Sequence, residues 1–185
     1  MRTVTPTPTA GADIDAVGVE SIWGHGNVYP LGLLTPWVDK AIFTANKNLF
    51  VNTMSYHYPR SCSIGAWKRD GWVTHTVWGI PKAQINLGIG YYSYNITASP
   101  RKIDPIVGGE PSWNTLSQAC PSLSPEVCVC QGINFASKAM NREIAAYVKA
   151  QGFRGLFPWA ANYDSPVATE SLAVWLGKGL GRAGY

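Results

Sequence analysis

The residues best suited to chemistry stand at the end of one apolar stretch, residues 49–58, which reads LFVNTMSYHY. Its β-branched and aromatic residues predict a strand, and Pro59 cannot continue a hydrogen-bonded ladder. Alternation places Met54 and Tyr56 on one face of this strand and His57 on the other. Open α/β sheets and α/β barrels bind their ligands at the carboxyl ends of the strands. We therefore expect a ligand site at this end, built from aromatic and hydrogen-bonding groups.

The composition narrows the class of ligand. The chain has 185 residues, enough for one ordinary domain, with 46% hydrophobic and only 14% charged residues. No apolar run reaches the roughly 18 residues of a membrane helix. The net charge of +4 comes from scattered Lys and Arg, so neither a nucleic-acid surface nor a membrane surface is expected. Abundant Trp and Tyr with few charges suit the flat, uncharged faces of sugar rings, although most of these aromatic residues are expected in the core.

Cysteine usage favours disulfides over metal. The four cysteines are Cys62, Cys120, Cys128 and Cys130. The spacing of the last two is not one that binds zinc, and no His lies near them, so no metal is expected. We expect Cys120 to pair with Cys128 or Cys130. Asn95-Ile96-Thr97 is a glycosylation acceptor sequence and also points to an oxidising compartment.

The amino terminus, by contrast, gives no support for secretion. Residues 1–11 are rich in Thr and Pro and contain no apolar stretch of the kind found in signal peptides. No signal peptide is expected in this chain. The segment is predicted to be disordered.

Strand-like and helix-like segments alternate along the chain. Strands are predicted over residues 17–23, 49–58, 85–94 and 153–159. Helices are predicted over 35–45, 72–78, 135–151 and 169–180, the last with Thr169 or Ser171 as its N-cap. Residues 60–71 are expected to form a polar loop, and 95–132 a long irregular insertion rich in Cys and Pro. Such alternation is typical of a parallel sheet built from βα units, either a small open sheet or half of a barrel.

The strand over residues 85–94 has two unlike faces. Ile85, Leu87, Ile89 and Tyr91 share one face, which is apolar. The other face carries Asn86, Gly88, Gly90 and Tyr92. Glycines at alternate positions predict a crowded face that another group approaches closely.

Three short sequence motifs, each at the end of a predicted strand, resemble those of a known family. The first is Met54-Ser55-Tyr56-His57. The second is Gly79-Ile80-Pro81 followed by residues 84–92, QINLGIGYY, and the third is residues 154–159, RGLFPW, with Asp164 beyond. In this order they resemble the ends of the sixth, seventh and eighth strands of family 18 glycoside hydrolases, the chitinase family. The resemblance covers roughly residues 17–180 and is closest to fungal members around residues 109–113 and 157–164.

The departures from that family shape the prediction. Its defining Asp-x-x-Asp-x-Asp-x-Glu motif on the fourth strand is absent, and the nearest sequence, residues 13–17, has Val17 where the Glu belongs. The resemblance therefore implies an α/β fold that is the C-terminal half, strands five to eight, of a TIM (β/α)8 barrel over residues 12–185. His57 stands where the family has Asp. The short insertion makes a full additional α+β subdomain unexpected.

The resemblance also implies roles for residues. Family 18 enzymes use the substrate's own acetamido group as the nucleophile while a Glu protonates the leaving oxygen. Tyr56 would position the acetamido group, and Trp159 would form the floor under the sugar. Met54, His57 and Tyr92 would line the same subsite, and the general acid Glu would lie outside this chain. The implied partner is chitin or an N-acetylglucosamine oligosaccharide, with no cofactor, an extracellular location and a monomer when the barrel is complete.

Two other functions stay open at this point. A non-catalytic chitin-binding lectin would keep the aromatic cleft without the acid. An inactive truncated gene product would have no function.

Some aromatic and acidic residues are expected outside any site. Trp23, Trp37, Trp72 and Trp175 are expected in the core, and Glu110 is expected to be a solvated surface carboxylate.

Overall fold

The structure is a computed structural model, and it describes residues 16–19, 40–56, 62–95 and 111–182. One parallel sheet has the strand order β1 (Ala16–Val19), β2 (Phe50–Thr53), β3 (Ile85–Gly90) and β7 (Gly155–Trp159). The helices around it are α1 (Lys40–Ala45), α2 (Gly65–Trp72), α4 (Lys138–Gln151) and α5 (Leu172–Gly179). The predicted parallel α/β sheet is confirmed.

Short helical segments complete these elements. The α2 helix continues as a π-helix, η3 (Val73–Val77), and a 3-10 turn, η4 (Lys82–Gln84), leads into β3. A second 3-10 turn, η5 (Ala161–Tyr163), follows β7. Within the described part of the chain, no helix is both long and apolar enough to span a bilayer.

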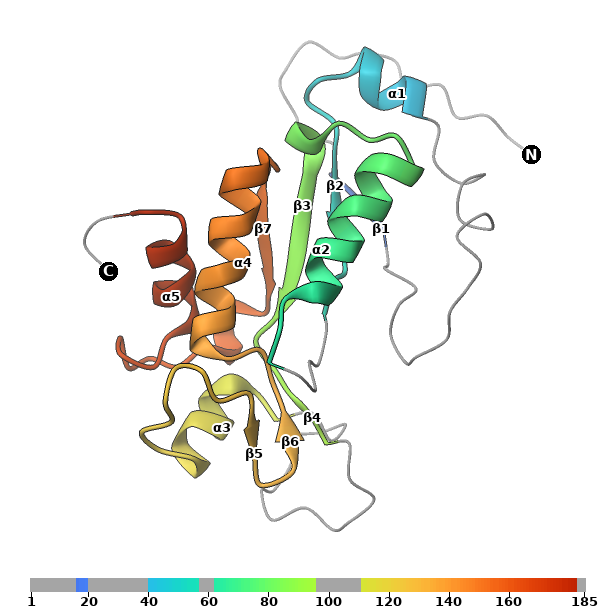
Figure 1. The fold of residues 1–185 in the computed structure, drawn as a ribbon. Helices are drawn as coiled ribbons and strands as arrows, with labels where there is room; N and C mark the ends of the chain where they lie inside the picture. The colour runs from blue at the N-terminus through green and yellow to red at the C-terminus, as the bar shows by residue number, and fades with distance from the viewer. Residues whose placement is uncertain (1–15, 20–39, 57–61, 96–110, 183–185) are drawn as a thin grey trace.

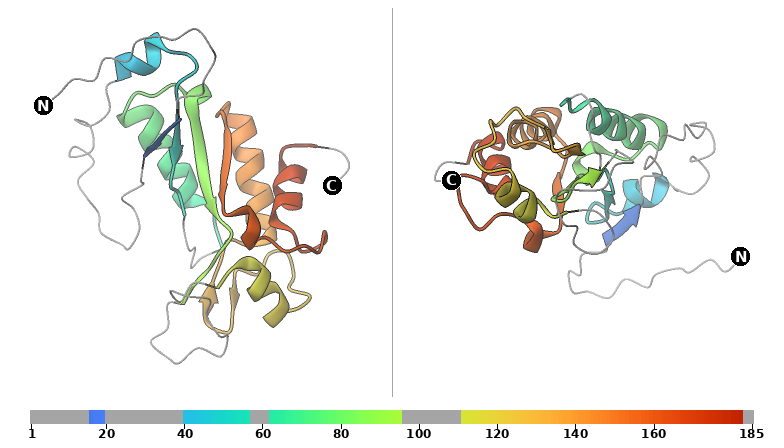
Figure 2. Two further views of the ribbon diagram at one scale, coloured as in Figure 1. Left: turned by 180° about the vertical axis from the view of Figure 1, so that it is seen from behind. Right: turned by 90° about the horizontal axis from the view of Figure 1, so that it is seen from below.

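The helices are distributed unequally over the sheet. Helices α2 and α4 cover one face, and α5 packs beside α4 (Figure 1). Seen from behind, the opposite face of the sheet is not covered by α2, α4 or α5 (Figure 2). The strands lie on the inner side of a curved layer of helices, which is the arrangement of a barrel segment.

The hydrophobic core lies between the sheet and α2 and α4. Val51, Ile85, Leu87 and Ile89 are each 0% exposed, so the predicted apolar face of β3 is confirmed. The indole of Trp67 in α2 is also fully buried, and its Nε1 donates a hydrogen bond of 3.0 Å to the carbonyl oxygen of Gly88. Burial of large apolar side chains from both layers is the main stabilising term for such a sheet.

A second, smaller unit stands at the carboxyl ends of the strands. It contains an antiparallel sheet with the order β4 (Tyr94–Asn95), β6 (Ile133–Asn134) and β5 (Val129–Cys130), and a helix, α3 (Trp113–Ala119). Residues 95–132 were expected to be irregular, and this expectation is wrong for the described part, which contains a helix and short strands. Ser112 caps α3 and accepts a hydrogen bond from the backbone of Thr115, a cap that the surrounding Pro, Ser and Cys residues concealed.

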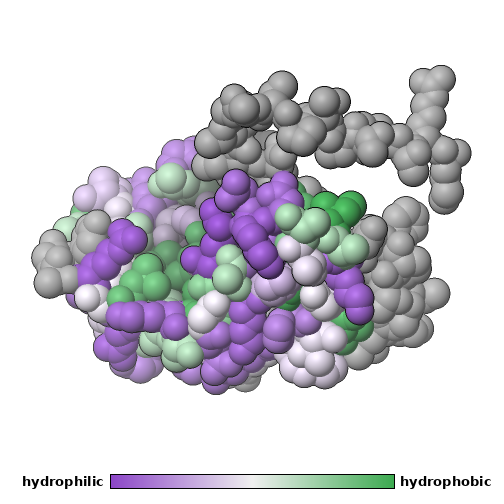
Figure 3. Space-filling view, turned by 90° about the horizontal axis from the view of Figure 1, so that it is seen from above, coloured by the Kyte–Doolittle hydropathy of each residue, from purple (hydrophilic) through white to green (hydrophobic). Residues whose placement is uncertain are grey.

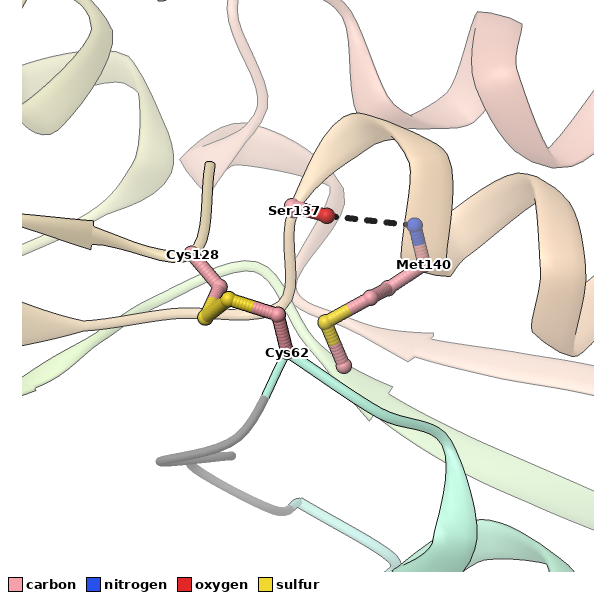
Figure 4. The surroundings of a disulfide bond; sticks show 4 residues. All are labelled: Cys62, Cys128, Ser137 and Met140. Atoms are coloured by element: carbon pink, nitrogen blue, oxygen red, sulfur yellow. Dashed lines mark hydrogen bonds between the residues drawn. A yellow bond between two sulfur atoms is a disulfide. The ribbon is translucent and has the colours of Figure 1, made fainter. Parts of the chain in front are cut away.

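Two disulfides stabilise this unit. Cys120 pairs with Cys130, which is one of the two pairings predicted for Cys120. Cys62 pairs with Cys128 across a sequence separation of 66 residues. This second bond lies beside the first turn of α4, where Ser137 accepts a hydrogen bond from the Met140 backbone and the Met140 side chain points toward Cys62 (Figure 4). No spacing in the sequence indicates the long-range pair.

The largest difference between the predicted and the observed secondary structure concerns α2. Residues 60–71 were expected to form a polar loop, but the helix begins at Gly65. Buried Trp67 and Gly71 are four residues apart and buried Ile64 precedes Trp67 by three, which is helical spacing. The charged Lys68 and Arg69 between them lie on the solvent face of the helix. They made the helical spacing of the buried residues hard to recognise in the sequence. Trp72 also faces solvent and is 51% exposed, so its expected core position is wrong.

The other element boundaries differ less. β2 ends at Thr53 rather than at residue 58, because the amides of Ser55 and Tyr56 turn back to the carbonyls two residues earlier. Ser171, not Thr169, caps α5. Gly152 ends α4 in the left-handed conformation, as predicted. The predicted start of the 35–45 helix and the disordered 1–11 segment lie outside the described residues.

The amino ends of the strands lie at the end of the molecule that Figure 3 shows. In the view onto it, hydrophobic residues gather in a hollowed part of the surface and hydrophilic residues surround them (Figure 3). The residues predicted to form the site lie at the carboxyl ends of the strands, away from this hollow.

Gly88 should be intolerant of any side chain. An added Cβ would overlap the carbonyl oxygen of Thr53 and lie 3.0 Å from both the backbone nitrogen of Ser55 and the ring of Tyr56. We expect Gly88→Ala to lower the free energy of unfolding by about 1–3 kcal/mol, the usual cost of overpacking. The matched control is Gly65→Ala at the start of α2, where the nearest atom is 3.6 Å away. Urea unfolding should show this control to be as stable as the parent or slightly more stable, and equal losses in both variants would contradict the packing argument.

Candidate functional site

Tyr56 lies just beyond the end of β2, on the face of the sheet opposite α2 and α4; among the described helices, α2, α4 and α5 leave this face uncovered. Its neighbours Thr53 and Ser55 are buried, and their hydroxyl oxygens lie 2.9 Å apart in a hydrogen bond. Thr53 also donates a hydrogen bond of 3.1 Å to the carbonyl oxygen of Asn86 on β3. These contacts fix the backbone from which the Tyr56 ring projects.

Glycines on β3 make room for the aromatic rings. An added Cβ on Gly88 would meet the ring of Tyr56, and one on Gly90 would lie 2.9 Å from the ring of Tyr92. The predicted crowded face is therefore confirmed. Two tyrosine rings occupy the space that side chains at these positions would fill.

An aromatic cluster crosses the carboxyl ends of three strands. The ring of Tyr56 lies 6.0 Å from that of Tyr92 and 6.3 Å from that of Phe157. The Phe157 ring is 6.5 Å from that of Trp159, and Tyr163 packs edge-on against Tyr92 at 6.4 Å. Such distances and tilted geometries are those of favourable aromatic pairs. We call these residues the aromatic row: Tyr56, Tyr92, Phe157, Trp159 and Tyr163.

The aromatic row is partly open to solvent. Trp159 is 52% exposed and Met54 is 36% exposed, although both are apolar. The peptide bond between Trp159 and Ala160 is cis. A row of rings that ends in an exposed indole can stack on a flat apolar face of a ligand.

A polar layer lies beside the aromatic row on the same face of the sheet. The Asn86 side-chain amide donates a hydrogen bond of 2.8 Å to the side-chain oxygen of Asn52 on β2. Gly155 pairs with Asn86 on the other side, where an added Cβ would lie 3.1 Å from the Asn86 side-chain oxygen. This layer offers neutral hydrogen-bonding groups rather than charges.

The Tyr56 hydroxyl is the most unusual polar group of the site. It is buried and has no hydrogen-bond partner among the residues that the structure describes. Burial, with a smaller contribution from Tyr92, raises the pKa of the Tyr56 phenol to about 12. The hydroxyl is therefore neutral at physiological pH and available to donate a hydrogen bond to a ligand.

The carboxylates of the described residues are engaged in other interactions. Asp164 accepts hydrogen bonds from the backbone amides of Leu172 and Ala173 and from the Ser171 hydroxyl, so it caps α5. Glu170 pairs with Lys138 at 3.0 Å. The remaining carboxylates are Glu143, which pairs with Lys68, Glu126, which binds Ser124, and Asp70, which is buried in α2.

No metal site is visible in the part of the chain described here, because His, Cys, Asp and Glu side chains do not gather there in groups of three or more. The site therefore offers aromatic faces and neutral hydrogen-bonding groups.

The structure brings together most of the residues predicted from the sequence. Tyr56, Tyr92 and Trp159 lie in the aromatic row, with Met54 at the end of the same strand as Tyr56. His57 lies outside the described residues.

Sequence analysis missed Phe157 and Tyr163. Phe157 could have been found, because alternation along β7 places it on the same face as Trp159. Tyr163 lies in the turn beyond the strand, where no periodicity applies.

Comparisons with solved structures identify the architecture. The chain superposes on a chitinase from Bacteroides thetaiotaomicron with a TM-score of 0.67 and 14% identity, covering 92% of this chain and 53% of that chain. A GH18 chitinase from Flavobacterium johnsoniae superposes with a TM-score of 0.58 and 18% identity, covering 77% of this chain and 45% of that one. The fold is that of the family 18 chitinases. No protein-family model and no curated protein sequence matches the chain.

A third similar structure contains a sugar ligand. A mutant class V chitinase from Nicotiana tobaccum, in complex with NAG4, superposes with a TM-score of 0.57 and 18% identity, covering 90% of this chain and 56% of that chain. This chain spans about half the length of the chitinases that it matches. The chitinase-like fold is thus present, and the activity, substrate and partners of a whole chitinase are proposals for this chain.

The raised pKa of Tyr56 predicts a loss of stability at alkaline pH. Below about pH 10 the phenol is protonated in the folded and the unfolded chain, so it makes no difference. As the pH rises from there to about 12, the unfolded chain loses this proton while the folded chain still holds it. The free energy of unfolding must therefore fall with pH in this window. Tyr56→Phe should lose less stability than the parent between neutral pH and about pH 11 in urea unfolding.

The control for this comparison is Trp72→Phe on α2, which changes an exposed aromatic side chain and removes no titratable group. Its alkaline loss should equal that of the parent. A Tyr56→Phe variant as alkali-sensitive as this control would contradict the assigned burial of the Tyr56 phenol.

Proposed function

We propose that this chain is the half of a chitinase-like domain that supplies strands five to eight of the barrel and one wall of the sugar cleft. In this assignment β1, β2, β3 and β7 are those strands. The observation that carries the proposal is the aromatic row, in which the Phe157 ring lies between the exposed indole of Trp159 and the ring of Tyr56, whose hydroxyl is buried and unpartnered among the described residues. A stacking surface next to a hydrogen-bond donor suits an N-acetylated sugar.

The proposed ligand is a β-1,4-linked N-acetylglucosamine polymer. Trp159 would stack under a sugar ring, and the neutral Tyr56 hydroxyl would donate a hydrogen bond to the acetamido carbonyl oxygen. Met54 and Tyr92 would line the same subsite, and we propose that His57 also contacts the sugar. The NAG4 bound by the Nicotiana enzyme, whose fold this chain shares, supports a ligand of this class.

The proposed reaction is substrate-assisted hydrolysis with retention. A Glu outside this chain would protonate the leaving oxygen while the acetamido oxygen attacks the sugar carbon. Tyr56 would hold the acetamido group in line for that attack, and its high pKa keeps it a donor throughout the working pH range. No cofactor takes part. The two disulfides support an extracellular location.

A lectin is the second candidate. The described carboxylates cap a helix, form ion pairs or are buried, so we propose that these residues offer sugar contacts but no acid. A chitin-binding protein without turnover needs only those contacts.

Binding of N-acetylglucosamine tetramer tests the site directly. Isothermal titration calorimetry should detect binding to the 185-residue chain, and Trp159→Ala should weaken it by about fivefold, since an aromatic stacking contact contributes about 1 kcal/mol. The matched control is Trp72→Ala on α2, which removes an indole that is 51% exposed and outside the aromatic row. Equal affinity in both variants, or no binding by the parent, would refute the assigned cleft.

Turnover separates the enzyme from the lectin. The isolated chain should not hydrolyse a chromogenic chito-oligosaccharide, because it lacks the proposed acid. When it is joined to a family 18 half-barrel that carries an intact Asp-x-x-Asp-x-Asp-x-Glu motif, hydrolysis should appear and Tyr56→Phe should reduce kcat by roughly 100-fold or more. Turnover by the isolated chain would disprove the external acid. A joined protein that binds the tetramer without turnover would favour the lectin.

A further inference from the structure

The chain segments that border the aromatic row are fastened to one another at the carboxyl ends of the strands. Cys62, six residues after Tyr56 in the sequence, is bonded to Cys128 of the small unit. Cys128 is fully buried, and its carbonyl oxygen accepts a hydrogen bond of 3.0 Å from the amide of Phe135. Cys62 is therefore attached to a buried point of the small unit.

A buried tryptophan links this buried point to the other segments. The ring of Trp113 lies 5.3 Å from that of Phe135. Its indole Nε1 donates a hydrogen bond of 2.7 Å to the carbonyl oxygen of Glu170, which precedes α5. Its backbone amide donates one of 2.8 Å to the carbonyl oxygen of Tyr91, which directly follows β3. One side chain and one amide thus connect α3 to the chain after β3 and after β7.

The same connections reach the second ring of the aromatic row. Tyr92 forms a backbone bridge with Ser112, the cap of α3. Ser93 donates two hydrogen bonds, of 3.0 Å from its amide and 2.8 Å from its hydroxyl, to the carbonyl oxygen of Pro111. Both partners of the Tyr56–Tyr92 ring pair therefore adjoin segments that the small unit holds.

We infer that the Cys62–Cys128 disulfide is a positioning element for Tyr56: it clamps the chain after β2 to the small unit and so presets the Tyr56–Tyr92 pair for ligand. The ligand in this inference is the one in the proposed function, so this part rests on that proposal. The clamp itself is argued from the disulfide and the hydrogen bonds of the small unit. Holding a binding segment in its bound position raises affinity because less freedom is lost on binding. The clamp acts through Tyr56 and touches no ligand itself.

The chain contains its own control. The Cys120–Cys130 disulfide spans only 10 residues and lies wholly within the small unit. The Tyr56 amide is a local probe, because it donates its hydrogen bond of 2.8 Å to the Met54 carbonyl oxygen in the turn after β2. Amides in the middle of α4, around buried Ile144, report on the global fold.

The test compares Cys62→Ala/Cys128→Ala with Cys120→Ala/Cys130→Ala in the full 185-residue chain. Hydrogen exchange followed by NMR should show the Tyr56 amide exchanging at least about tenfold faster in the first variant, with the α4 amides unchanged. The same variant should bind N-acetylglucosamine tetramer about tenfold more weakly. In the second variant both quantities should stay within about twofold of the parent.

Three outcomes would overturn the clamp. These are an unchanged Tyr56 amide in the first variant, an equal change in both variants, and an acceleration in α4 as large as that at Tyr56, which would mean that the bond acts on the whole fold. Failure of the parent to bind the tetramer would refute the proposed function instead. In that case the exchange of the Tyr56 amide still decides whether the clamp exists.

Discussion

The close approach of β2 to β3 at Gly88 is the constraint on which the rest of the structure depends. The carbonyl oxygen of Thr53 and the ring of Tyr56 occupy the space where a side chain at this position would lie. On the other face, the Gly88 carbonyl oxygen accepts a hydrogen bond from the buried indole of Trp67. One residue without a side chain thus joins the helical layer, the sheet and the candidate site.

Two kinds of stabilisation serve two parts of the molecule. The parallel sheet is stabilised by burial of apolar side chains against α2 and α4, so it needs no covalent bonds. The small unit has short strands, and its two disulfides and the buried Trp113 compensate for its small core. Because this unit stands at the carboxyl ends of the strands, the bonds that stabilise it also fix the surroundings of the aromatic row.

The division between the two faces of the sheet links the fold to function. The covered face is apolar, as a buried parallel sheet requires. The uncovered face carries the amides of Asn52 and Asn86 and then the rings of Tyr56 and Trp159. In a closed barrel, groups of this kind face the interior and its mouth, where sugar-binding sites of α/β barrels lie. The chemistry of this face thus agrees with the chitinase-like fold found by comparison.

The parallel α/β sheet follows from local patterns in the sequence. Alternation along β3 and helical spacing along α4 are such patterns, so Ile85–Gly90 and Lys138–Gln151 could be read directly. The expectation that Tyr56, Tyr92 and Trp159 lie together came from the resemblance to family 18 glycoside hydrolases, because the motifs that carry it stand at strand ends.

The remaining features depend on contacts between distant segments of the chain. The Cys62–Cys128 pair joins residues 66 apart, and no local pattern records such a distance. The capping of α5 by Asp164 and the packing of Tyr163 on Tyr92 also depend on contacts between loops. Local propensity determines elements, whereas contacts between distant loops arise only when the whole chain is folded.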